Sequence, residues 1–103
     1  MNTFYNKLQE FTLLEIQKFQ KEISVQNLEE SIITKEITLK NGLVIRISKW
    51  LNMDIFVKFK HKTDIDSYTF EELIKTNYIP EKYQKDEYLE VHSRNLAYGK
   101  MEL

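Results

Sequence analysis

The sequence predicts an α+β fold in one domain that spans residues 1–103. The predicted order is an N-terminal amphipathic helix, a three-stranded antiparallel β-meander, and one or two C-terminal helices packed on the sheet. Three observations support it: apolar residues at helical spacing near the N-terminus, alternating residues around an Asn-Gly pair, and a helix-capping signature further on. A chain of 103 residues suits one domain with a modest core.

The first predicted element is a helix that starts near Thr3 and either ends near Ser24 or continues, frayed, towards Glu30. Leu13 and Leu14 lie off its apolar face, and two interpretations stay open for them. In the first, they pack on a second element or are exposed singly; in the second, they form an edge that contacts a partner. At about 100° per residue, the following apolar residues fall on one face of the helix: Phe4, Tyr5, Leu8, Phe11, Ile16, Phe19 and Ile23.

The middle of the chain predicts a β-hairpin centred on Asn41-Gly42. A two-residue turn would mix apolar and charged residues on both faces of the hairpin. A three-residue turn with Gly42 in the left-handed region pairs Ile37 with Ile45 and gathers the apolar residues on one face, so we prefer this register. Lys35 is then the one charged residue on the apolar face, while Glu36 faces Arg46 on the other.

A third strand is predicted over 53–62, because apolar and polar residues alternate there. We expect Met53, Ile55, Val57 and Phe59 to point into the core. The opposite face of the sheet then carries a mixture of cations and apolar side chains: Val44, Arg46, Ser48, Trp50, Phe56, Lys58 and Lys60.

A second helix is predicted after Thr69, because Thr69 and Glu72 form a capping-box signature. We interpret Asp64 and Asp66 as part of a turn that leads to this cap. The helix should end near Asn77, before Pro80, which is suited to begin a third helix. The remaining segment is predicted to be helical at first, with His92 in a C-terminal helix and with Tyr83, Tyr88 and Tyr98 available to pack on the sheet.

Composition narrows the compartment and the class of protein. The chain has no Cys, which excludes disulfides and thiolate metal sites. We see no signal peptide and no apolar run of the length that a membrane helix needs, so we expect a cytoplasmic protein without a membrane partner. The net charge of −1 conceals a basic middle third: residues 35–62 carry +5 and residues 63–103 carry −4.

Catalytic motifs are weak in this sequence. Neither a nucleophile elbow nor a phosphate-binding loop is present. A calcium loop that starts at Asp64 would place Thr69 and Lys75 where Gly and Glu are required. A metal-free ribonuclease would need Arg46, Lys58, His61 and a tyrosine together. We therefore predict no catalytic residues, no metal and no cofactor.

The predicted function is a non-catalytic protein-binding module, such as a small bacterial or phage inhibitor, immunity protein or counter-defence protein that docks on a larger partner. Its basic and aromatic candidates are Arg46, Trp50, Phe56, Lys58 and Lys60. The alternative is nucleic-acid binding by the same residues, because cations and aromatic rings together bind single strands. A metal-free ribonuclease is a further alternative. The acidic candidates for a partner surface are Asp64, Asp66, Glu71, Glu72, Asp86, Glu87 and Glu90.

Overall fold

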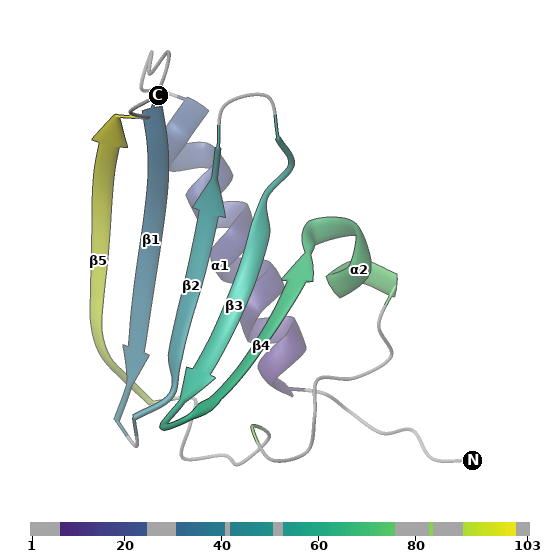
Figure 1. The fold of residues 1–103 in the computed structure, drawn as a ribbon, viewed down its shortest axis with the longest axis vertical. Coiled ribbons are helices and arrows are strands. Elements are labelled where there is room, and N and C mark those ends of the chain that lie inside the picture. The colour runs from purple at the N-terminus through teal and green to yellow at the C-terminus, as the bar shows by residue number, and fades with distance from the viewer. Residues whose placement is uncertain are drawn as a thin grey trace.

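The computed structural model describes residues 7–24, 31–40, 42–50, 53–75, 83 and 90–100. In chain order the elements are α1 (Lys7–Ser24), β1 (Ser31–Leu39), β2 (Val44–Lys49), β3 (Phe56–His61), β4 (Asp64–Thr69), α2 (Phe70–Lys75) and β5 (Val91–Lys100). The strands form one antiparallel sheet in the order β4-β3-β2-β1-β5, and α1 lies across one face of it (Figure 1). The α+β class, the N-terminal helix and the antiparallel sheet are confirmed, but the sheet has five strands rather than three.

The β1–β2 hairpin has the predicted three-residue register. Ile37 lies opposite Ile45 and Glu36 lies opposite Arg46. Gly42 closes the turn with a φ of 97°, and its N–H donates to the carbonyl of Leu39 at 2.9 Å. A side chain at this φ would be strained, which is why glycine occupies the position.

The core lies between α1 and the face of the sheet that we call the covered face. The apolar residues predicted for this face in the β1–β2 hairpin are buried, and so are Ile55, Val57 and Phe59. Met53 was predicted to join them, but it is 53% exposed because β3 begins three residues later, at Phe56. Phe4 and Tyr5 lie outside the described residues. The helix contributes three fully buried side chains to the core: Leu8, Ile16 and Phe19.

The segment Asp64–Thr69 is a strand, so its interpretation as a turn was wrong. β4 pairs with β3 along its whole length, and the turn between them has Lys62 at a φ of 58°. The capping box at its end is confirmed: the Thr69 N–H donates to Glu72 Oε1 at 2.8 Å, and the Glu72 N–H donates to Thr69 Oγ1 at 3.0 Å. This exchange satisfies two backbone donors at the start of α2.

The segment Val91–Lys100 is also a strand, which corrects the predicted C-terminal helix and the placement of His92 in it. β5 pairs antiparallel with β1, with a bulge between Thr38 and Leu39. Tyr83 is buried against the core, and its ring stacks on Phe59 with centroids 6.0 Å apart. Asn77, Pro80 and Tyr88 lie outside the described residues, as does the side chain of Tyr98.

Candidate interaction surface

The sheet has a second face, opposite α1, which we call the open face. Neither α1 nor α2, the two helices of the described part of the chain, lies over it (Figure 1). Because side chains alternate along a strand, the register of the sheet decides which residues point there. Among them are Glu36, Val44, Arg46, Phe56, Lys58 and Lys60.

The five basic and aromatic candidates come together on this face. Arg46 lies opposite Lys58, and Lys60 and Phe56 lie on the same side of β3. Trp50 follows β2, and its ring centroid is 5.9 Å from that of Phe56, with the rings tilted by 56°. Arg46 and Lys60 are exposed and the other three are half-buried. The sequence pattern thus places these residues correctly on one surface.

The charge of the open face is positive but not uniform. Glu36 Oε2 accepts from Arg46 Nη2 at 2.8 Å and from Arg46 Nε at 3.1 Å. In the described part of the chain, no ion pair involves Lys58 or Lys60. Among the described residues, the patch therefore holds two ammonium groups without an ion-pair partner beside one guanidinium–carboxylate pair.

An open groove of about 460 Å³ lies beside Phe56, between the ends of β3 and β4. Asp54 and Glu72 line it together with apolar atoms of Met53. The backbone N–H of Thr69, and the contact with its hydroxyl, hold the pKa of Glu72 below its usual value, so this carboxylate is charged at neutral pH. Carboxylates at this position favour a neutral or basic group in the groove over a phosphate.

The acidic candidates do not form one surface. Asp66 accepts a hydrogen bond from the Tyr83 hydroxyl at 2.7 Å on the covered side, and Asp64 lies at the opposite end of β4 from Glu71 and Glu72. Burial, and then this hydrogen bond, raise the pKa of Tyr83 far above its usual value. The Glu71 carboxylate pairs with Lys75, and that of Glu90 pairs with Lys40. Asp86 and Glu87 lie outside the described residues.

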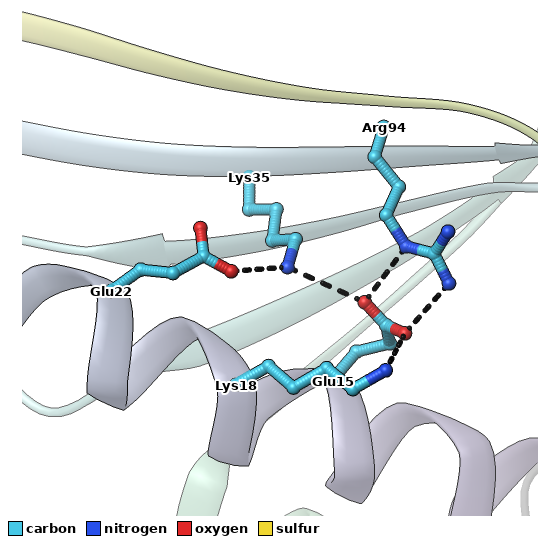
Figure 2. A network of polar contacts seen from close by, with 5 residues as sticks. All are labelled: Glu15, Lys18, Glu22, Lys35 and Arg94. Carbon is cyan, nitrogen blue, oxygen red and sulfur yellow. Dashed lines mark hydrogen bonds and ion pairs between the residues drawn. The ribbon is translucent and has the colours of Figure 1, made fainter.

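A cluster of five charged side chains lies between α1 and the sheet (Figure 2). Glu15, with a side chain only 2% exposed, accepts from Arg94 Nε at 3.2 Å and from Arg94 Nη2 at 3.0 Å. Lys35 Nζ lies 3.5 Å from Glu15 and donates to Glu22 at 2.7 Å, and Lys18 approaches Glu15 from the solvent side. The cluster joins α1 to β1 and β5.

Burial disfavours the charged form of Glu15, but the hydrogen bonds and charge of Arg94, with the charges of Lys35 and Lys18, outweigh it. The pKa of Glu15 is therefore held below its ordinary value of 4.5. The sequence signalled this cluster only through Lys35 on an apolar face. Glu15 and Arg94 are 79 residues apart, so spacing alone could not connect them.

The described residues of the ribonuclease and metal-site alternatives are not brought together in the structure. His61 lies on the face of β3 opposite Arg46 and Lys58, close to Gly42, so the strand separates the groups that a ribonuclease would need together. Among the described residues, no three His, Asp or Glu side chains converge as metal ligands would.

A second groove, of about 310 Å³, runs between α1 and α2. Leu13 is half-buried and packs against the core, whereas Leu14 is 52% exposed. Phe70 and Ile74 of α2 line the same groove. The packing interpretation therefore fits Leu13, and Leu14 remains a surface residue.

Comparisons with protein-family models, with curated proteins and with solved structures find no match to this chain. Within the described residues, neither helix combines the length and the apolar character required to cross a membrane.

Proposed function

We propose that this protein is a non-catalytic binding module that docks on another protein through its open face, as a small inhibitor, immunity or counter-defence protein would. The observation that carries the proposal is the half-buried Trp50–Phe56 pair beside Arg46 and Lys58 on a face that no described helix covers. Trp and Arg are enriched among the residues that dominate protein–protein binding energy. We retain the prediction that the protein acts in the cytoplasm.

Three features of the open face favour a protein over a nucleic acid as the partner. Glu36 neutralises Arg46 in the middle of the patch, and Asp54 and Glu72 line the groove beside Phe56. A phosphate backbone would meet these carboxylates, whereas a protein partner can match charges of both signs. The tilt of 56° between Trp50 and Phe56 also means that the rings contact each other rather than form two parallel stacking platforms.

Affinity capture with the purified chain from its native host, followed by mass spectrometry and titration of the purified partner, tests the proposal. Trp50→Ala and Lys58→Glu should each weaken the captured complex at least tenfold. Lys75→Glu, a charge reversal on exposed α2, is the matched control and should bind as the parent chain does. A partner that binds all three variants equally would contradict docking through the open face.

Nucleic-acid binding is the second candidate, because Lys58 and Lys60 have no ion-pair partner among the described residues and lie beside two aromatic rings. Trp50 is the single tryptophan of the chain, so its fluorescence reports directly on this face. Titration with short single-stranded RNA and DNA should change the emission, and the affinity should fall steeply with added salt. An unchanged emission at low salt excludes this candidate.

A further inference from the structure

Among the described strands, β5 has the longest outer edge with no neighbouring strand paired to it. β5 spans ten residues and pairs with β1 on one side, while no described strand pairs with its other side (Figure 1). From Ser93 to Lys100 its register with β1 is regular. An exposed, regular edge of this length is a template for pairing with another strand.

The charged cluster beneath α1 holds this edge in place. Arg94 of β5 makes two hydrogen bonds to the buried carboxylate of Glu15, which also lies 3.5 Å from Lys35 of β1 (Figure 2). β5 is thus tied to the helix as well as to its neighbouring strand. A strand fixed in this way loses little conformational freedom when a partner strand is added.

The two edges of the sheet differ in how they are protected. β4, at the other edge, has six residues, carries Asp64 and Asp66, and leads directly into α2. Two β4 edges paired around Ile65 would oppose Asp64 to Asp66, and the strand continues directly into α2, which discourages pairing there. On β5, the open-face residues Ser93, Asn95 and Ala97 are small or uncharged.

From this asymmetry we infer that two copies of the chain associate by antiparallel pairing of β5 with β5. A two-fold axis perpendicular to the sheet makes the strands antiparallel and keeps the covered faces on one side. The interface uses the same edge of both copies, so it closes on itself and yields a dimer rather than a filament. The inference concerns a surface separate from the proposed docking face.

The charges of β5 and the length of its regular segment together favour one register. A two-fold at Arg94 would oppose two guanidinium groups, and a two-fold at Ala97 would oppose Arg94 to Lys100. Two-folds at Asn95 and at Leu96 both avoid these conflicts. The one at Asn95 pairs only residues 93–97 of the regular segment with their copy, because the register is irregular before Ser93, whereas the one at Leu96 pairs residues 93–99. Leu96 then faces Leu96 of the second copy, and Asn95 lies opposite Ala97.

Sedimentation of the full chain over a concentration series tests the inference. The parent chain should shift from one to two chains per particle as the concentration rises. Asn95→Lys places a charge on the exposed face of the edge and should keep the chain monomeric. Ser67→Lys makes the same change on the exposed face of β4 and should leave the dimer intact, with circular dichroism confirming that both variants fold.

Three results would overturn the inference: a parent chain that stays monomeric throughout, an Asn95→Lys variant that dimerises like the parent, or a Ser67→Lys variant that loses the dimer. If the parent chain stayed monomeric, the alternative partner for the β5 edge would be an extended segment of a different protein.

Disulfide trapping checks the register in a chain that has no cysteine of its own. Opposed residues of an antiparallel pair have Cα atoms about 4.5–5.5 Å apart, which suits a disulfide. A mixture of Asn95→Cys and Ala97→Cys chains should therefore form a linked heterodimer under mild oxidation, and neither variant alone should do so efficiently. Efficient linkage of Asn95→Cys to itself would support edge pairing but reject the register centred on Leu96.

Discussion

Each face of the sheet carries an Arg–Glu pair, and the N–O distances in the two pairs are similar. On the covered face, Arg94 Nη2 lies 3.0 Å from Glu15, and on the open face, Arg46 Nη2 lies 2.8 Å from Glu36. They differ in exposure to solvent: the Glu15 side chain is 2% exposed, whereas that of Glu36 is 35% exposed. Distance alone therefore does not tell what either pair contributes.

The difference in burial assigns the two pairs different roles. A buried carboxylate that loses its partners costs several kcal/mol, because it has no water to replace them. An exposed pair contributes about 0–1 kcal/mol, because water competes with it and salt screens it. The Glu15 cluster therefore fixes the fold, and the Glu36–Arg46 pair leaves its charges available to a partner.

The largest difference in unfolding free energy between the two faces should come from substitutions of two phenylalanines of β3. Phe59 is fully buried on the covered face, and Phe56 is half-buried on the open face. Phe59→Ala should lower the free energy of unfolding by about 3–5 kcal/mol, and Phe56→Ala by about 1 kcal/mol. Urea denaturation followed by circular dichroism measures both, and equal losses would contradict the division into two faces.

Glu15→Gln should give the next largest effect. It removes the charge that neutralises Arg94 and Lys35, but Lys35 keeps Glu22 and Arg94 is 42% exposed. We therefore expect a loss of about 2–3 kcal/mol in the free energy of unfolding, below the range for a fully buried pair. The same substitution at Glu36 is the control, and a loss at Glu36 as large as that at Glu15 would refute the argument from burial.

The buried pair should also show a pH dependence. The pKa of Glu15 is lower in the folded state than its ordinary value of 4.5, so its contribution is complete above that pH and is lost as the pH falls through the folded pKa. The difference in unfolding free energy between the parent and Glu15→Gln should therefore shrink below pH 4.5. Phe56→Ala removes no charge, and its difference from the parent should stay constant over the same range.

Sequence reasoning predicted the parts of the fold whose signals are local. The turn at Gly42 and the cap at Thr69 each depend on a few neighbouring residues, and the pairing of Ile37 with Ile45 follows from the sorting of apolar side chains. The same sorting placed Arg46 and Phe56 on one face. These features need no knowledge of the rest of the chain.

The two edge strands escaped prediction for a physical reason. An edge strand packs against fewer neighbours, so segments such as Asp64–Thr69 and Val91–Lys100 need few apolar residues and show weak alternation. Their pairing is decided by distant partners: β5 pairs with β1 across more than fifty residues. Lys35 was visible as an exception on an apolar face, but its partner Glu15 is on another element.

The smallest effect should come from Glu36→Gln on the open face. The substitution leaves Arg46 half-exposed to water, which can solvate the freed guanidinium, so the loss in unfolding free energy should be below about 1 kcal/mol. Added salt should reduce that small difference further, because it screens an exposed pair. The difference for Glu15→Gln should change much less with salt, because little solvent or salt reaches a carboxylate that is 2% exposed. If the two differences fell equally with salt, the Glu15 cluster would be as open to solvent as the Glu36–Arg46 pair, and the assignment of structural and available charges to opposite faces would fail.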